Sequence, residues 1–275
     1  MEQHAGQAAT ASEAERAQAE PTTVGASLDL RFEDSFETFV SRLADLGLSH
    51  VEVRPGYLQT HPDAPSAERV RRVADERDLT VSVHAPHLDV NPANLDEGLR
   101  QATADRLRET LDWAAAAGAR AVVTHAGSTR TRYPERVRER ARAQAVTTLR
   151  GAARHAVEVG IPLCVENQRD KPGYHRFSAT PDRLEALLED VGVESPALAV
   201  TLDVGHAKAT GVPYEAFVDR FGDRIRVAHL HDNDGIEDAH DPLPDFRDVA
   251  ADIGAEFNVL EMKSHADIRR SVGAG

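Results

Sequence analysis

Seven apolar, strand-like runs in this sequence each end at, or just before, an acidic or histidine side chain. The runs and these residues are VEVRP (Glu52), SVHAPH (His84), VVTHAG (His125), LCVENQ (Glu166), VTLDVGHA (Asp203 and His206), VAHLHDN (His229) and VLEMK (Glu261). A ring of parallel strands gathers residues from distant sequence onto one face in this way, because all its strands exit on the same side. The pattern therefore predicts a metal site at the mouth of a barrel.

The strand-like runs alternate regularly with segments of helical periodicity. Strands are expected at about residues 26–32, 50–54, 80–85, 120–125, 161–166, 198–203, 225–230 and 257–262. Helices are expected at 35–47, 66–78, 95–117, 135–159, 181–191 and 214–222, with two short ones at 245–253 and 264–272. The fold class predicted is α/β, a single-domain (β/α)8 TIM barrel over residues 25–275, since such a barrel takes about 250 residues.

Residues 1–24 are rich in Ala, Gln, Glu and Thr and have no apolar periodicity. Such a segment buries too little surface to offset its ordering entropy, so a disordered N-terminal extension is expected. It lacks a cationic start followed by an apolar core, and no later stretch approaches a membrane-spanning length. We therefore expect a cytoplasmic protein with no membrane partner. Its single cysteine, Cys164, excludes an internal disulfide and a cysteine-based zinc site.

The formal net charge is −14 at pH 7. This acidity argues against a surface that binds nucleic acid generally, because phosphate contacts require cations, although a local basic patch is compatible with it. Lysine is confined to Lys171, Lys208 and Lys263, and arginine supplies the other cations. A surface of this kind resembles those of halophilic, salt-adapted proteins, and it describes the solvent more than the ligand.

Side-chain alternation predicts which residues fill the barrel below the site. The residues two positions before the strand-end groups are small or branched, and they are Ser82, Val123, Cys164, Thr201, Val227 and Val259. Cys164 is therefore interpreted as a core residue rather than a nucleophile. The histidines outside the ring are interpreted as surface residues, and they are His4, His50, His61, His155 and His265.

Three carboxylates and one imidazole form the central candidate set: Glu166, Asp203, His229 and Glu261. Mixed oxygen and nitrogen ligands suit Mn, Mg, Co or Zn. Further candidates are His84, His125, His206, Asp238 and His240, with His231 as a rival ligand. A single such residue at a strand end is often a cap or an ion-pair partner. Several carboxylates buried together without a cation would be costly, which favours the metal interpretation.

The motifs VHAPH, THAG, VEN, LDVGHA, HLHDNDG, DAH and LEMK occur in this order. Over residues 25–263 the chain resembles the xylose-isomerase-like TIM-barrel superfamily, which includes sugar phosphate isomerases and epimerases and the endonuclease IV type of apurinic (AP) endonuclease, family 2. The isomerase branch implies one metal at the four central residues, with His206 near substrate. The endonuclease branch implies three zinc ions, held by all nine residues. The segment DPLPDF departs from the superfamily pattern, so the loop after DAH is shorter.

Isomerising or epimerising a sugar requires removal of a proton next to a carbonyl and stabilisation of the enediolate that forms, which a divalent ion favours. Glu166 and Glu261 are assigned as base and acid, with His206 as a third catalytic residue. His84 and His125 are assigned both as substrate contacts and as further ligands. Substrate-binding cations are expected in the loop after the fifth strand: Arg169, Lys171 and Arg176.

The function expected is thus a divalent-metal-dependent sugar or sugar-phosphate isomerase or epimerase without a nucleotide cofactor. The alternative is a zinc-dependent apurinic DNA endonuclease, and only this alternative makes DNA a partner. A third interpretation is a barrel that binds a metal or a sugar without turnover, for which so many ligand types are not needed. Assembly into a homo-oligomer is compatible with the sequence.

Overall fold

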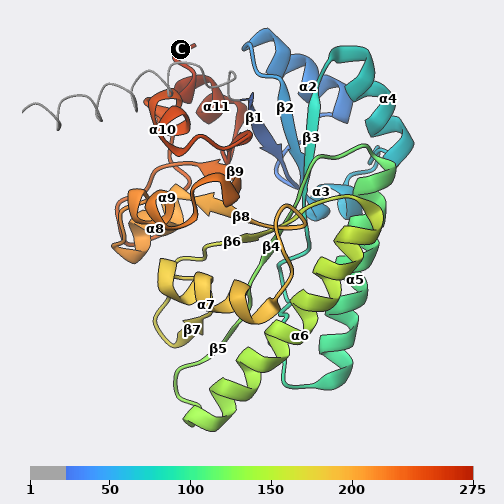
Figure 1. Ribbon diagram of the computed structural model, residues 1–275. Helices are drawn as coiled ribbons and strands as arrows, with labels where there is room; N and C mark the ends of the chain where they lie inside the picture. The colour runs from blue at the N-terminus through green and yellow to red at the C-terminus, as the bar shows by residue number, and fades with distance from the viewer. Residues whose placement is uncertain (1–22, 275) are drawn as a thin grey trace, which may run out of the picture.

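The computed structural model describes residues 23–274, in which eight parallel strands close into a barrel surrounded by helices (Figure 1). Neighbouring strands follow the order β1-β10-β9-β8-β6-β4-β3-β2. The strands are β1 (Thr23–Leu28), β2 (His50–Val53), β3 (Thr80–His84), β4 (Val122–His125), β6 (Leu163–Glu166), β8 (Leu198–Asp203), β9 (Ile225–Leu230) and β10 (Phe257–Leu260). The expected (β/α)8 TIM barrel is confirmed.

Each expected helix is found, with bounds that differ by at most two residues. The helices are α2 (Phe36–Asp45), α4 (Ala67–Arg77), α5 (Glu97–Ala116), α6 (Glu135–Val159), α7 (Pro181–Val191), α9 (Glu215–Phe221), α10 (Phe246–Ile253) and α11 (His265–Ser271). Local signals explain the bounds of α7. The Thr180 side chain accepts from the Arg183 N–H, Pro181 occupies the first turn, and Gly192 ends the helix at a φ of 64°.

Four short elements were not expected. They are α3 (Pro55–Thr60), α8 (Val204–Thr210) and an antiparallel pair formed by β5 (Ser128–Arg130) and β7 (Tyr174–Arg176). A three-residue 3-10 helix, Gly222–Arg224, also follows α9. The β5–β7 pair joins the loops that leave β4 and β6, and α8 starts directly at the end of β8. Both features shape the face from which the strands exit.

The first strand begins earlier than the expected 26–32. Thr23 pairs with Phe257 of β10, and Gly25 pairs with His50 of β2, so the chain enters the barrel at Thr23. Residues 29–31 form a turn instead, in which the Arg31 backbone N–H donates to the Asp29 carboxylate at 2.8 Å. The extension expected over residues 1–24 lies outside the described residues, apart from the two that begin β1.

The barrel interior is packed with side chains from alternate strand positions. Its apolar cluster contains Ala121, Val123, Cys164, Ala199, Val227, Phe257 and Val259. Side-chain alternation predicted that six residues fill the interior. Four of them belong to this cluster, namely Val123, Cys164, Val227 and Val259, and the other two, Ser82 and Thr201, are buried as well. Burial raises the pKa of the Cys164 thiol to about 12, which agrees with a core residue. A larger apolar cluster fills the space between strands and helices.

His50 was expected at the surface, and this expectation is wrong. The side chain is 0% exposed and lies inside the barrel, stacked on the Phe257 ring at 5.0 Å between ring centroids. The physical reason is strand alternation. His50 precedes Glu52 by two residues, so both side chains point to the same interior. Within residues 23–274, no helix has the length and apolar character needed to cross a bilayer.

Gly25 lies where β1 passes too close to β2 to leave room for a side chain. A Cβ atom at this position would lie 1.7 Å from the His50 carbonyl oxygen, a backbone atom that cannot rotate away. We predict that Gly25→Ala lowers the free energy of unfolding by about 1–3 kcal/mol or more, which is the usual cost of overpacking. Denaturant unfolding followed by circular dichroism measures this change.

Gly151→Ala is the matched control, because a Cβ there meets only the flexible end of Arg108 at 3.7 Å. Its position in the middle of α6 predicts unchanged stability or a gain of about 0.5–1 kcal/mol. Equal stability of Gly25→Ala and the wild type would contradict the strand register described.

Candidate metal centre

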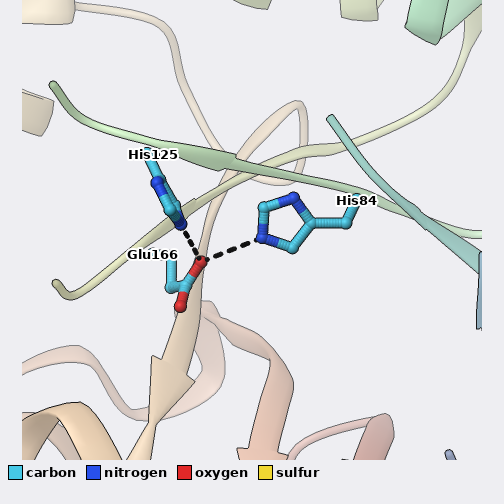
Figure 2. Close-up of side chains that lie close together, drawn as sticks. All are labelled: His84, His125 and Glu166. Atoms are coloured by element: carbon cyan, nitrogen blue, oxygen red, sulfur yellow. Dashed lines mark hydrogen bonds and ion pairs between the residues drawn. The ribbon is translucent and has the colours of Figure 1, made fainter. Parts of the chain in front are cut away.

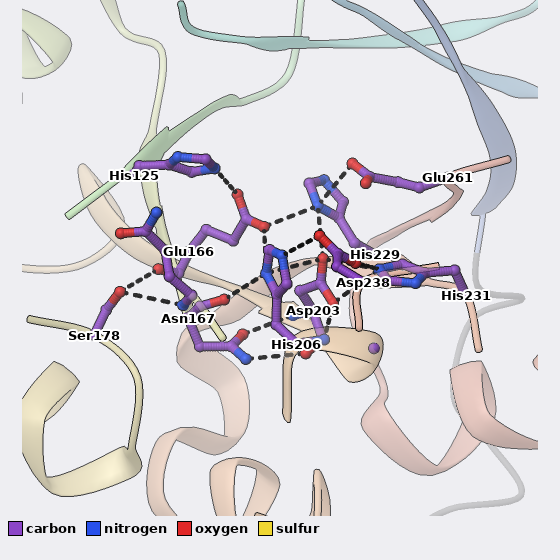
Figure 3. Close-up of polar contacts among 12 residues, drawn as sticks. His125, Glu166, Asn167, Ser178, Asp203, His206, His229, His231, Asp238 and Glu261 are labelled. Atoms are coloured by element: carbon purple, nitrogen blue, oxygen red, sulfur yellow. Dashed lines mark hydrogen bonds and ion pairs between the residues drawn. The ribbon is translucent and has the colours of Figure 1, made fainter. Parts of the chain in front are cut away.

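The four central candidate residues meet where β6, β8, β9 and β10 exit the barrel (Figure 3). The Nδ1 atom of His229 lies 3.0 Å from Oε1 of Glu261, 3.6 Å from Oε1 of Glu166 and 3.9 Å from Oδ2 of Asp203. All four side chains are buried. We call this group the central cluster, and its members come from strands that lie up to about 100 residues apart in the sequence because the parallel strands end at one rim.

The central cluster has the charge of a cation site and an unpaired nitrogen. His229 Nδ1 is buried and has no hydrogen-bond partner within residues 23–274. Burial raises the pKa of Glu166, but His125, His206 and His229 outweigh it and hold that pKa well below its usual value. The pKa of Asp203 is also lowered, since His206 and His231 outweigh its burial. Arg54 pairs with Glu261 and neighbouring histidines face Glu166 and Asp203, and a divalent ion would complete the balance of charge among the three carboxylates.

A second group, the lateral cluster, consists of His84, His125 and Glu166 (Figure 2). Nε2 of His84 lies 3.3 Å and Nε2 of His125 lies 3.1 Å from the same Oε2 atom of Glu166. Glu166 therefore turns one oxygen toward each cluster. Burial lowers the pKa of His125, which favours the neutral ring that a metal needs.

The hydrogen bond on the other side of the His84 ring determines what its Nε2 offers. Nδ1 lies 2.7 Å from the carbonyl oxygen of Ala85, which only accepts, so Nδ1 carries the hydrogen. In the neutral ring Nε2 then points a lone pair at the Glu166 carboxylate, an arrangement that needs a proton or a metal ion between the two atoms. Metal-bound histidines commonly donate their other N–H to a carbonyl in this way.

The third group, the outer cluster, consists of His206, His231, Asp238 and His240. Nε2 of His206 lies 3.1 Å from Oδ2 of Asp238, and Nε2 of His240 lies 3.4 Å from its Oδ1. The Nδ1 atom of each ring donates to a backbone carbonyl, that of Asn167 for His206 and that of Glu261 for His240. Burial disfavours a charged His206, but Asp203, Asp238 and Glu166 outweigh it and raise its pKa well above the usual value.

Backbone contacts hold Asp203 in place. The side-chain N–H of Asn167 donates to the backbone carbonyl of Asp203 at 2.9 Å. The side-chain oxygen of Asn167 accepts from the backbone N–H of Asp203 at 2.7 Å. Asp203 also caps α8, because its Oδ1 accepts from the His206 N–H at 2.6 Å. The motifs VEN and LDVGH thus fix the two strand ends to each other, and they orient one oxygen of Asp203 toward the centre.

The three cations expected to bind substrate are not gathered in one place. The Arg169 guanidinium donates to the Ile236 carbonyl at 3.3 Å, and Lys171 lies over the Tyr174 ring at 5.8 Å. Arg176, on β7, is half-buried and has no ion pair within residues 23–274. Burial and Arg169 lower its pKa, against the opposing attraction of Glu166 and Asp238. Of the three, Arg176 is the one that faces the clusters.

Sequence reasoning missed Arg54 altogether and gave Glu52 a minor place. Arg54 forms an ion pair with Glu261, and its Nε lies 3.7 Å from Oε1 of Glu52. Glu52 in turn accepts from Nε2 of His229 at 3.1 Å. The signal for Arg54 was its place in VEVRP, two residues after Glu52 at the exit end of β2, but an arginine at a strand end is usually solvated.

A cavity of about 350 Å³ opens beside the central cluster, above the ends of β1, β2 and β3. Its lining includes Asp29, Arg54, His87 and His240, with Leu30 and Leu88 as apolar walls. Arg54 and His240 both contact Glu261, so the cavity adjoins the candidate ligands directly. Burial and the neighbouring His84 and His125 lower the pKa of His87 to about 2, which leaves a neutral ring for hydrogen bonding.

Comparisons with known proteins agree with this architecture. A family model described as a xylose isomerase-like TIM barrel matches residues 40–269. An uncharacterized protein of Methanocaldococcus jannaschii is 30% identical over 185 residues, which cover 66% of this chain and 61% of that protein. The chain therefore spans less than two thirds of the length of this relative.

Two solved structures share the fold. A D-tagatose 3-epimerase-like protein is 23% identical with a TM-score of 0.76, covering 91% of this chain and 94% of that one. A Thermus thermophilus protein, TTHB071, soaked with ZnCl2, is 24% identical with a TM-score of 0.66, covering 92% and 98%. At these identities the likeness is one of fold.

We predict that Mn²⁺ or Co²⁺ stabilises the chelator-treated protein and that Asp203→Asn abolishes the effect. A ligand at about 100 times its Kd contributes about 2.7 kcal/mol, on the order of 5–10 °C in Tm for a chain of this size. Thermal unfolding with and without metal measures the shift. Without metal, Asp203→Asn should melt somewhat lower than the wild type, because His206 and His231 stabilise the Asp203 charge, so the metal effect is read as the shift within each protein.

Asp219→Asn, on the exposed side of α9, is the matched control and should retain the full shift. An unshifted wild type, or an equal shift in Asp203→Asn, would rule out the central cluster as the principal metal site.

Proposed function

The chain belongs to the xylose isomerase-like TIM barrel family, and from that premise we propose that it is a divalent-metal-dependent sugar or sugar-phosphate isomerase or epimerase. The observation that carries the proposal is the placement of Glu166 and Glu261 around one nitrogen of His229, at 3.6 and 3.0 Å from its Nδ1 atom. Two carboxylates beside one cation site are what proton removal and return next to a carbonyl require.

The residues that would hold the ion are Glu166, Asp203, His229 and Glu261. When bound, a divalent ion supplies a Lewis acid that polarises the sugar carbonyl and stabilises the charge that develops on its oxygen. The oxygen-rich donor set favours Mn, Mg, Co or Zn. Solved neighbours support this choice in a general way, since one of them was soaked with ZnCl2.

Proton transfer is assigned to the two glutamates. Glu166 lies at the end of β6 and Glu261 just after β10, so they approach a bound sugar from different directions. One removes the proton from carbon and the other returns it, and return to the opposite face of the carbon gives epimerisation. Arg54, paired with Glu261, would keep that carboxylate ionised and oriented. His206, held by the Asn167 carbonyl, would orient hydroxyl groups.

The cavity lined by Arg54, His87 and His240 is the proposed sugar subsite. Its volume of about 350 Å³ lies in the range of small-ligand sites, and neutral His87 and charged Arg54 offer hydrogen bonds to hydroxyl groups. Leu30 and Leu88 would cover the apolar face of the sugar ring. Arg176 is the proposed contact for a phosphate, because it faces the clusters and forms no ion pair among the described residues.

One observation favours the second candidate, a zinc-dependent apurinic DNA endonuclease. The lateral, central and outer clusters bring together all nine residues that the resemblance assigns to three zinc ions. The net charge of −14 disfavours it, since duplex DNA requires several neutralised phosphates. We therefore rank proton transfer on a sugar first.

We predict that the metal-loaded protein exchanges hydrogen with D2O at a sugar carbon next to the carbonyl, observed by proton NMR with ketoses, aldoses and their phosphates. Glu166→Gln and Glu261→Gln should each lose at least about 1000-fold in exchange rate, because each variant removes a ligand charge and a proton carrier. Both should remain folded by circular dichroism. Chelation should abolish exchange by the wild type.

Glu189→Gln, exposed on α7, is the matched control and should exchange at the wild-type rate. Incubation with a duplex that contains an abasic site tests the second candidate. Strand cleavage that requires metal and Glu261, together with no sugar exchange, would overturn the proposal.

A further inference from the structure

A chain of buried hydrogen bonds leads from the middle of the barrel to the central cluster. Thr80 Oγ1 lies 2.8 Å from Nδ1 of His50, and Nε2 of His50 lies 2.9 Å from Oγ of Ser82. Ser82 donates to Oε2 of Glu52 at 3.2 Å, and the same oxygen lies 3.1 Å from Nε2 of His229. Strands β2, β3 and β9 contribute these residues. The interior is otherwise largely apolar, so this polar chain needs an explanation.

The donors in this chain all point toward Glu52. Nε of Arg54 lies 3.7 Å from Oε1 of Glu52, and a carboxylate paired with a guanidinium only accepts. Ser82 has one hydroxyl hydrogen and gives it to Glu52, hence its oxygen accepts from Nε2–H of His50. Burial lowers the pKa of His50 to about 4, so that ring is neutral and its Nδ1 accepts from Thr80. The single hydroxyl hydrogen of Thr80 then goes to His50, at 2.8 Å, rather than to the Ser49 carbonyl oxygen, which lies farther away at 3.3 Å.

The same logic fixes the far end of the chain. Because Glu52 only accepts, Nε2 of His229 carries the hydrogen and donates it. Nδ1 of His229, a buried atom without a hydrogen-bond partner among residues 23–274, is then the nitrogen that faces Glu261, Glu166 and Asp203. Beside these carboxylates it holds either a second proton or a metal ion, and only the metal-bound ring is neutral. Without Glu52, the ring has no group that defines which nitrogen is protonated.

We propose that Glu52, held by Ser82 and His50, is a positioning residue that fixes His229 as the Nε2–H tautomer and so presents Nδ1 as a metal ligand. The inference rests on the proposed function only in that the central cluster holds the metal. The hydrogen-bond chain itself extends from that cluster into the barrel interior, and it assigns a role to the buried His50. Stacking on Phe257 holds His50 in the orientation that the chain requires.

The first measurement is the protonation of the His229 ring. In the wild type, the ¹⁵N shifts of His229 should report a protonated Nε2 without metal, and with Zn²⁺ bound a protonated Nε2 and an unprotonated, metal-bound Nδ1, with the signals assigned by their loss in His229→Asn. In Glu52→Gln the side-chain amide both donates and accepts, so both tautomers of His229 should be populated. An unprotonated Nε2 in the wild type, or a protonated Nδ1 with Zn²⁺ bound, would overturn the proposal.

The second measurement is titration of the chelated proteins with Co²⁺ alone, followed by visible absorption. Glu52→Gln should bind Co²⁺ about 10–100-fold more weakly, as loss of a residue that orients a metal ligand does. Ser82→Ala should shift binding in the same direction by a smaller factor, and it keeps the test valid should Glu52→Gln misfold. Thr201→Val is the matched control, because it also removes a buried interior hydroxyl, one with no hydrogen-bond partner in the described chain.

The outcomes separate this inference from the proposed function. Wild-type Co²⁺ affinity in both Glu52→Gln and Ser82→Ala would overturn the positioning role and leave the metal-dependent function intact. A wild type that binds no Co²⁺, but has a protonated Nε2 on His229, would overturn the function while the hydrogen-bond chain stands. Weakened binding in Thr201→Val equal to that in Ser82→Ala would reduce the effect to general packing, and would also contradict the proposal.

Discussion

Charge crowding at the barrel mouth is the constraint on which the rest of the structure depends. Glu166, Asp203 and Glu261 are buried around one imidazole nitrogen of His229, with Arg54 paired to Glu261. Buried carboxylates this close together need compensating positive charge, which protonated histidines supply without metal and a divalent ion would supply in their place. The parallel strands bring the ligands to one rim, and the capping and amide contacts of Asp203 hold them there.

Glu166 links the two leading interpretations of the site. Its Oε1 faces the central cluster and its Oε2 faces His84 and His125. A proton on His84 satisfies the second contact, and so does a second metal ion, because Nδ1 of His84 is committed to the Ala85 carbonyl. The isomerase and the endonuclease thus differ less in which residues are present than in how many ions they hold.

Much of this arrangement could be predicted from the sequence, because period-two alternation and strand-end position are local signals. They indicated the barrel, the helix bounds and the four central residues. The pairing of Glu52 with His229, 177 residues away, could not be predicted, since it depends on how the barrel closes between non-adjacent strands. The DAH motif did name His240 as a candidate, but its orientation could not be predicted, because it follows an irregular loop and has a φ of 53°, which no periodicity encodes. His50 was misplaced because its two-residue spacing from Glu52 was not applied.

The most direct test of the central claim is the metal content of the protein purified without chelator, measured by mass spectrometry per folded chain. The arrangement predicts close to one divalent ion per chain for the wild type, and close to none once Asp203 is replaced by Asn. A wild type without bound metal would contradict the account, and so would a content that the Asp203→Asn replacement leaves unchanged. A content near three would transfer the assignment from sugar chemistry to phosphodiester hydrolysis.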